Sequence, residues 1–194
     1  DLVRMHQEDF CQALGYSCSK KYESDGGPGL AKCFALLDEH STQPASDKRS
    51  LLQWTAFNYI IGNCDAHAKN LSMMISRADY RLAPFYDLLS TRAYPALSAN
   101  FAMRIGKQRR ADWVSRTHWE RVAEEAGVGA KAVFAACEEL GELVPLKAQA
   151  LSKDFIASHG AEQTLGRILK GIEAAGRGLL GTIKSKAGPD KERT

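Results

Sequence analysis

Polar side chains of the types used in phosphoryl transfer are concentrated in one short segment. Residues 63–70 read Asn-Cys-Asp-Ala-His-Ala-Lys-Asn, so Asp65 is followed five positions later by Asn70, and Asp87 follows beyond a hairpin-like stretch. An Asp, an Asn and a second Asp in this order is the arrangement with which a kinase holds a nucleophile, a metal ion and the phosphates of ATP. The segment is therefore a candidate phosphoryl-transfer site.

A chemical task can be assigned to each of these groups. Transfer of a γ-phosphate to a hydroxyl needs positioning and charge neutralisation more than covalent help. Asp65 is suited to orient the hydroxyl as its base. Magnesium prefers hard oxygen ligands, which predicts Asn70 and Asp87 as its protein ligands. Lys69 is expected to contact phosphate, and His67 to hold the shape of the loop.

Each residue also has a plain structural explanation. Isolated Asp and Asn residues in loops are most often turn formers, and a lone His or Lys is usually a satisfied structural group or a solvated charge. The catalytic interpretation depends on the whole set, because a polar loop between a buried helix and a hairpin has no structural need for all of these groups.

Cys64 and His67 have the spacing of half a zinc site, but no second half of suitable spacing is present. The glycines of residues 22–29 lack the G-K-[S/T] ending of a phosphate-binding loop.

The elements that must position this segment are predicted from hydrophobic patterning. Residues 47–61 are apolar nearly all round, which predicts a central helix that ends at Gly62. Residues 70–75 and 80–83 predict two short strands joined by a turn. This hairpin would bring Asp87 back towards Asn70.

The remainder of the chain is predicted to be mainly helical. Residues 1–15 and 30–37 have helical apolar faces, and the signals beyond Pro95 are mainly helical. A capping box at Thr117 and Glu120 predicts a helix from about residue 118 to 126. Further helices are expected over residues 130–143 and 152–182, with a break in the latter near Gly160, Gly171 or Gly176.

Composition limits the class of protein. A chain of 194 residues with 44% hydrophobic and 25% charged residues is ordinary for one compact globular unit. Its net charge of +3 is too small to make nucleic-acid binding the main task. Neither a membrane-spanning segment nor a secretion signal is evident, which predicts a cytoplasmic protein without membrane contact. Its five scattered cysteines form no C-x-x-C pair, so reduced and mostly buried thiols are expected.

Four ordered segments resemble the C-terminal lobe of HipA-type serine/threonine kinases, which are the toxins of bacterial toxin-antitoxin pairs. Beyond about residue 110 only general helical character matches. The four segments are RMHQEDFCQALG (residues 4–15), KYESDGGPG (21–29), IGNCDAHAKN (61–70) and LAPFYD (82–87).

The resemblance implies a mostly helical lobe of a protein-kinase-like fold, with a small β-hairpin at the catalytic site. It also implies ATP as phosphate donor, autophosphorylation on a Ser, and a protein substrate such as an aminoacyl-tRNA synthetase. A HipB-like, DNA-binding antitoxin is the implied partner, so that DNA is contacted only through it. The implied site residues are Asp65 as catalytic base, Asn70 and Asp87 as Mg²⁺ ligands, and His67, Lys69 and Tyr86 at the nucleotide.

Under this resemblance residues 1–186 form the lobe and residues 187–194 a flexible tail. An N-terminal lobe with a phosphate-covering loop and an ATP-binding lysine is expected outside this chain, because Lys20, Lys21 and Lys32 lack the strand context of such a lysine. The chain also has no initiator Met, so we expect a fragment of a longer kinase, with a separate polypeptide as the alternative source of the other lobe. The isolated lobe is expected to bind ATP weakly and to turn over little.

Two other functions compete with this one. A small-molecule phosphotransferase of the aminoglycoside- or choline-kinase type has a similar Asp, His and Asn pattern, but residues 4–15 and 25–29 favour the HipA type. A non-catalytic module that binds an antitoxin is the other alternative. The presence of Asp65, Asn70 and Asp87 together argues against such a loss of activity.

Overall fold

The computed structural model describes residues 4–185 and is mainly helical, as predicted. No helix within these residues has the length and apolarity needed to cross a bilayer. In chain order the elements are β1 His6–Asp9, α1 Phe10–Ala13, η1 Glu23–Asp25, α2 Leu30–His40, α3 Pro44–Ile61, η2 Ala68–Asn70, β2 Ser72–Ile75, β3 Tyr80–Leu82, η3 Thr91–Ala93, β4 Asn100–Ile105, β5 Gln108–Arg110, η4 Ala111–Trp113, α4 Arg116–Ala126, α5 Ala130–His159 and α6 Glu162–Lys184.

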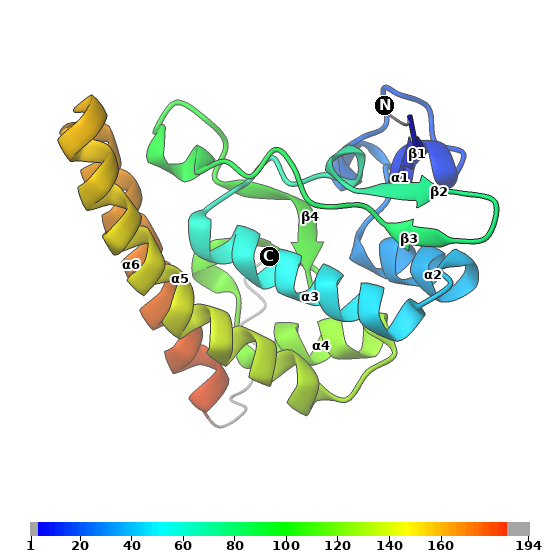
Figure 1. Cartoon of the computed structure of the whole chain (residues 1–194). Helices are drawn as coiled ribbons and strands as arrows, with labels where there is room; N and C mark the ends of the chain where they lie inside the picture. The colour runs from blue at the N-terminus through cyan, green and yellow to red at the C-terminus, as the bar shows by residue number, and fades with distance from the viewer. Residues whose placement is uncertain (1–3, 186–194) are drawn as a thin grey trace.

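Helix α3 runs through the middle of the molecule, with the paired helices α5 and α6 at one side and the small sheet β1–β2–β3 at the other (Figure 1). The predicted central helix is confirmed, although it begins at Pro44, whose fixed φ suits a first helical position. Its end is also as predicted, because Gly62 takes the left-handed conformation (φ 71°) that glycine adopts without steric cost. The loop after α3 therefore starts from a rigid, buried support.

The predicted hairpin is present, and it gains a third strand. β2 and β3 pair antiparallel, with Met73 opposite Leu82, and β1 pairs antiparallel with the other edge of β2. The prediction of one helix over residues 1–15 is wrong in its described part, because the backbone of residues 6–9 pairs with β2 before α1 begins. Asp9 starts that short helix by accepting a hydrogen bond from the Gln12 amide (2.9 Å). Residues 1–3 of the predicted helix lie outside the described residues.

A buried carboxylate joins the hairpin to α3. Asp47 is 3% exposed and accepts hydrogen bonds from the Arg81 guanidinium (2.8 Å), the Ser41 hydroxyl (2.6 Å) and the Leu82 amide (2.9 Å). Burial alone would raise the pKa of Asp47, but these hydrogen bonds and the charge of Arg81 together hold it below its ordinary value. The contact fixes β3, and the chain that follows it, against the first turn of α3.

We expect Asp47→Asn to lower the free energy of unfolding by about 2 kcal/mol at pH 7, because Arg81 loses its partner. The folded-state pKa lies below the unfolded value of about 3.8, so this stabilisation is present above pH 4 and is lost as the pH falls through the folded-state pKa. Urea unfolding of both proteins between pH 7 and pH 2.5 should show the difference shrinking as the pH falls. The exposed Asp154→Asn is the control, and a difference independent of pH would contradict the prediction.

The mainly helical prediction beyond Pro95 is wrong between residues 100 and 110. β4 and β5 form an antiparallel hairpin through a tight turn at Gly106 and Lys107, which both have positive φ (52° and 75°). A side chain at Gly106 would collide with the backbone carbonyl of His118, at 2.0 Å from an ideal Cβ. β4 is also held from its other side, because the Ala102 amide donates to the Cys64 carbonyl (2.9 Å) in the loop after α3.

Helix α4 is present but is capped differently from the prediction. It begins at Arg116, and its N-cap is Ser115, whose hydroxyl and amide both contact His118 Nδ1 (2.7 and 3.0 Å). The predicted box at Thr117 and Glu120 is therefore wrong, because Thr117 already lies inside the first turn. The predicted stop at Gly127 is confirmed by its left-handed conformation (φ 62°).

Helix α5 is longer than predicted. It continues through Pro145, where proline removes a backbone donor and normally disturbs a helix, and it ends at His159. Of the three positions predicted for a break, only Gly160 interrupts the helix, because Gly171 and Gly176 lie inside α6. An ideal Cβ on Gly176 would lie 2.7 Å from Pro145 Cγ and 2.9 Å from the Gly141 carbonyl oxygen. Helix α6 therefore packs closely against α5 at the position of Pro145. The predicted tail at residues 187–194 lies outside the described residues.

This close approach predicts opposite effects of one substitution at two glycines of α6. Gly181→Ala should stabilise the protein by up to about 1 kcal/mol, because nothing lies within 4 Å of its ideal Cβ and alanine favours the helix. Gly176→Ala should destabilise it despite the same gain, because overpacking against Pro145 costs roughly 1–3 kcal/mol. Urea unfolding of both variants measures the difference. Equal stabilisation by the two would contradict the prediction, because α5 and α6 would then move apart at Gly176 without a cost in stability.

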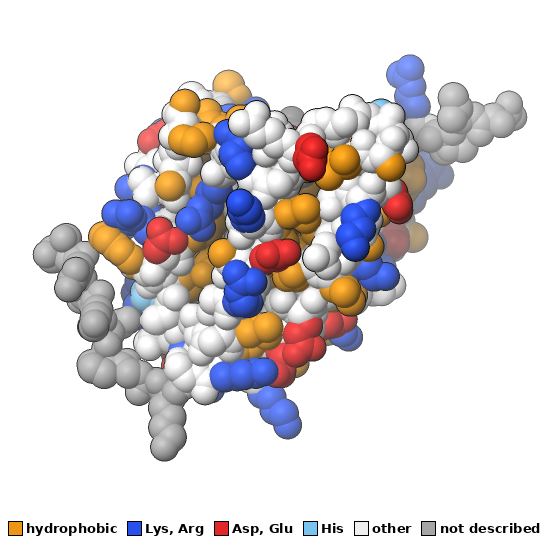
Figure 2. All heavy atoms as spheres, turned by 90° about the vertical axis from the view of Figure 1, so that its left-hand side faces the viewer, with side chains coloured by type: hydrophobic (Ala, Val, Ile, Leu, Met, Phe, Trp, Pro, Cys, Tyr) orange, Lys and Arg blue, Asp and Glu red, His pale blue; other side chains and the backbone are white. Residues whose placement is uncertain are grey.

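The cysteines are reduced and mostly buried, as predicted, and the surface carries charges of both signs. All five cysteines are free, and Cys11, Cys33, Cys64 and Cys137 are buried while Cys18 is exposed. Burial raises the pKa of the Cys33 and Cys137 thiols well above the ordinary range. Figure 2 shows the face at the α5–α6 side, where basic, acidic and hydrophobic side chains are interspersed over the described part of the surface.

Candidate active site

The loop between α3 and η2 is held by hydrogen bonds to its own backbone. Thr91 carries two of them, because its Oγ1 accepts from the Cys64 amide (2.7 Å) and donates to the Gly62 carbonyl (3.1 Å). Within the loop, the His67 amide donates to the Asp65 carbonyl (2.9 Å), and the Asn70 amide donates to the His67 carbonyl (2.9 Å). The side chains of residues 65–70 thus project from an ordered backbone.

Asn63 joins the two segments that carry the predicted site residues. It is 1% exposed, and its amide nitrogen donates to Asn58 Oδ1 (2.8 Å) and to the Asp87 carbonyl (3.1 Å). Its side-chain oxygen accepts from the Asp65 amide (3.2 Å). The buried Asn63 therefore connects the backbones of Asp65 and Asp87, a role that its position in the sequence does not indicate.

Asp65 has one hydrogen-bond partner for its carboxylate among the described residues. Tyr22 donates its hydroxyl to Asp65 Oδ1 (2.8 Å) from the segment before η1. The other carboxylate oxygen, Oδ2, can accept a further hydrogen bond, for example from the hydroxyl group that receives the phosphate. Tyr22 was missed as a site residue because it lies 43 positions away in the chain and no local pattern links the two.

The two predicted metal ligands present oxygen atoms without competing partners. The side-chain nitrogen of Asn70 donates to the Asp65 carbonyl (3.2 Å), and its side-chain oxygen accepts no hydrogen bond from residues 4–185. The exposed Asp87 carboxylate likewise accepts no hydrogen bond from these residues. Asp87 also has a positive φ of 55°, which is uncommon outside glycine. No cluster of three His, Cys, Asp or Glu side chains suited to a metal lies within residues 4–185. Two oxygen ligands completed by phosphate and water fit Mg²⁺ better than any metal that needs a full protein cage.

His67 lies beneath Tyr22. It is buried, and its ring meets the Tyr22 ring edge to face with a centroid distance of 5.4 Å. Burial, followed by the nearby charge of Lys21, lowers the pKa of His67 below its ordinary value, so the ring is neutral near pH 7. Its Nδ1 has no hydrogen-bond partner among the described residues. A neutral ring in this position supports the side chain that holds Asp65.

Lys69 and Tyr86, the other predicted nucleotide contacts, are neighbours. The Tyr86 hydroxyl donates to the Lys69 carbonyl (2.7 Å) and contacts Ser72 Oγ (2.8 Å). This bond ties residues 84–87 to η2. The Lys69 ammonium has no ion pair with another described residue, so it is available for an anion.

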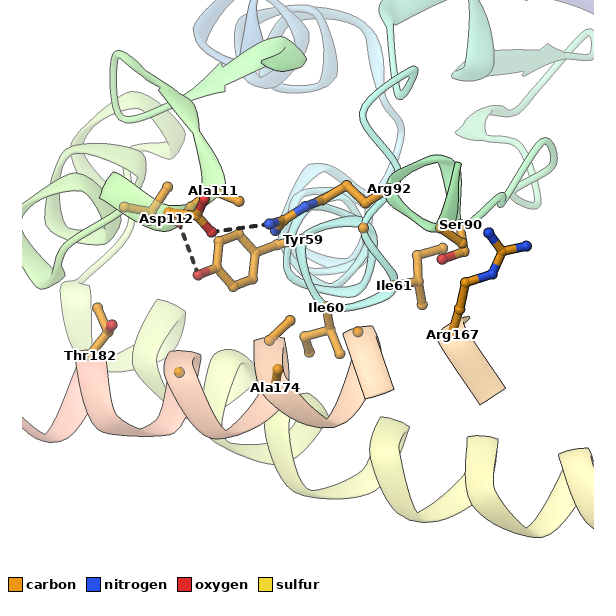
Figure 3. A pocket seen from close by; sticks show the side chains of 16 residues that line it. Tyr59, Ile60, Ile61, Ser90, Arg92, Ala111, Asp112, Arg167, Ala174 and Thr182 are labelled. Atoms are coloured by element: carbon orange, nitrogen blue, oxygen red, sulfur yellow. Dashed lines mark hydrogen bonds and ion pairs between the residues drawn. The ribbon is translucent and has the colours of Figure 1, made fainter. Parts of the chain in front are cut away.

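Two cavities of similar size lie near this loop. The Asp65 cavity, which is bounded by Asp65, Tyr22 and part of β4 and β5, has a volume of about 460 Å³. The second cavity, of about 450 Å³, lies behind the loop between the end of α3 and α6, and Figure 3 shows Arg92 paired with Asp112 across it. This second cavity contains none of the predicted site residues. The Asp65 cavity is therefore the one related to the candidate chemistry.

Comparison with known proteins identifies the family. The model of the HipA-like C-terminal domain matches residues 1–147, which is most of the chain. The chain belongs to the HipA-like C-terminal domain family. The predictions of a HipA-type C-terminal lobe and of a mainly helical fold are thereby confirmed.

Curated relatives of this HipA-like chain are kinases by name. It is 50% identical over 126 residues to a putative kinase, Y4mE, of Sinorhizobium fredii, covering 65% of this chain and 30% of that protein. It is 36% identical over 115 residues to the serine/threonine-protein kinase toxin HipA of Shewanella oneidensis, covering 54% of this chain and 26% of that protein. The matched segments thus span less than a third of the length of these relatives.

A solved structure has the same fold as this HipA-like chain. It is the complex of HipA, HipB and operator DNA from the toxin-antitoxin system of Shewanella oneidensis MR-1, with a TM-score of 0.84 and 24% sequence identity. The match covers 93% of this chain and 45% of the matched chain. It extends past the family match at residue 147, so α5 and α6 belong to the shared fold.

Proposed function

We propose that this chain is the C-terminal lobe of an ATP-dependent serine/threonine protein kinase that acts as the toxin of a bacterial toxin-antitoxin pair. The observation that carries the proposal is the link through Asn63, which joins the loop of Asp65 and Asn70 to Asp87 in a member of the HipA-like family. Phosphoryl transfer needs a base and metal ligands held together in this way. Residues 1–186 are proposed to form this lobe.

Asp65 is proposed as the catalytic base, since its free carboxylate oxygen can accept a hydrogen bond from the acceptor hydroxyl. Asn70 and Asp87 would hold Mg²⁺, which would neutralise charge on the phosphate oxygens when bound. His67, Lys69 and Tyr86 are proposed to lie at the nucleotide, with Lys69 as the available cation. ATP is the proposed phosphate donor, and the rest of its site is expected in the portion of the longer kinase outside this chain.

The proposed partner is a HipB-like, DNA-binding antitoxin, with DNA contacted only through it, and the proposed setting is the cytoplasm. Support comes from the solved complex that shares this fold, which contains HipA, HipB and operator DNA. The proposed substrate is a protein used in translation, such as an aminoacyl-tRNA synthetase.

The proposal is tested by incubating the full-length protein with γ-labelled ATP, Mg²⁺ and a cell extract. Labelled protein that requires Mg²⁺ is the expected result, and mass spectrometry should place the phosphate on Ser or Thr. Labelled small molecules without labelled protein would identify a small-molecule phosphotransferase instead. No labelled product in either fraction, with the antitoxin still bound, would identify a non-catalytic antitoxin-binding module.

A further inference from the structure

The Asp65 cavity contains the proposed base but neither of the proposed metal ligands. Asp65 and its partner Tyr22 line it, whereas Asn70 and Asp87 do not. In an in-line transfer the attacking oxygen and the leaving oxygen lie on opposite sides of the phosphorus atom. The Asp65 cavity carries the base without the metal ligands, so it lies on the side of the phosphorus atom from which the substrate hydroxyl attacks.

The lining of this cavity suits a segment of polypeptide. Its volume of about 460 Å³ lies within the roughly 300–1,000 Å³ typical of ligand sites. Leu89 and Leu97 contribute apolar surface while remaining 51% and 54% exposed, and Ser98 adds a hydroxyl. Exposed apolar side chains beside a cavity offer contact area to a bound polypeptide.

Only two charged side chains line the cavity within the described residues, Asp65 and Arg109. Arg109 lies in β5, is exposed, and has no ion pair with another described residue. The next residue, Arg110, points to the other side of the strand, where its guanidinium lies 4.3 Å from the centre of the Trp113 ring. One arginine of the pair is therefore engaged by an aromatic ring, and the other is available to a ligand in the cavity.

We propose that the Asp65 cavity binds the hydroxyl-bearing segment of the protein substrate, and that Arg109 selects an acidic side chain near the Ser or Thr that is phosphorylated. This inference rests on the proposed kinase function. In the reaction the acceptor oxygen bonds to the γ-phosphorus, the bond from that phosphorus to the β,γ-bridging oxygen breaks to leave ADP, and the hydroxyl proton passes to Asp65. Arg109 takes no part in these steps and acts as a specificity residue.

The test uses the full-length protein, ATP with Mg²⁺, and a Ser-centred peptide library whose flanking positions carry either Asp and Glu or Lys and Arg. The wild-type protein should phosphorylate the acidic set with a kcat/KM about fivefold higher or more. Arg109→Glu should reverse this preference, and Arg109→Gln should remove it. Arg110→Glu makes the same change of charge one residue away and should keep the wild-type preference.

The outcomes separate this inference from the proposed function. Absence of transfer to any peptide or extract protein overturns the kinase function and the inference together. Transfer without an acidic preference, or with a preference that Arg109→Glu leaves unchanged, overturns the inference alone. The same holds if Arg109→Glu slows transfer to all peptides equally, because Arg109 would then act on ATP. Labelling of extract proteins but of no peptide also overturns it, because a short segment would then not fill the cavity.

Discussion

Replacing Asp65 by Asn is expected to reduce phosphoryl transfer by the full-length protein by about a thousandfold. Asn has nearly the same shape and can still accept the Tyr22 hydroxyl at its side-chain oxygen, so the loop should keep its conformation. What it loses is the negative charge and the ability to take the proton of the acceptor hydroxyl. Transfer of label from ATP to protein, measured at saturating ATP, gives the loss directly.

A second acidic residue near the same cavity provides the matched control. Asp25 is exposed in η1, next to Ser24, which lines the Asp65 cavity. Asp25→Asn removes the same charge without removing the base, and it should transfer phosphate at close to the wild-type rate. In cells, the Asp65→Asn protein should have lost the toxicity of the wild-type protein. If it transfers phosphate normally and is equally toxic, Asp65 is not the base.

Replacing Asp87 by Asn is expected to raise the Mg²⁺ concentration needed for half-maximal transfer by at least about tenfold, because a neutral amide is a weaker ligand than a carboxylate. The choice of Asn matters here. Asp87 has a φ of 55°, a conformation that Asn tolerates and most other residues do not. Asn should therefore remove the charged ligand without adding backbone strain.

Phosphate transfer measured against Mg²⁺ concentration tests this prediction, with urea unfolding as the check on stability. The variant should unfold at the wild-type urea concentration, and high Mg²⁺ should recover part of its activity. Asp25→Asn should keep the wild-type Mg²⁺ requirement. An Asp87→Asn protein with an unchanged Mg²⁺ requirement would assign the metal to other ligands.

The elements around the site were predictable where their signals are local. The apolar residues of α3 and the left-handed stop at Gly62 are decided by residues a few positions apart, and so is the turn between β2 and β3. The prediction failed where partners are distant. Residues 6–9 form a strand because β2 is available to pair with them, and β4 lies against Cys64 through the Ala102 amide.

The sequence by itself determined which groups are available for chemistry: an Asp, a His, a Lys and an Asn within residues 65–70, a later Asp87, and a helix and hairpin to carry them. It also indicated the family, because short ordered segments preserve residue types and spacing. Only the tertiary structure decided how these groups are held. The Tyr22 hydroxyl on Asp65 and the Asn63 link to Asp87 cross 43 and 24 positions of chain, and Arg109 reaches the same cavity from β5. Such contacts depend on how the elements pack, and no local pattern in the sequence encodes them.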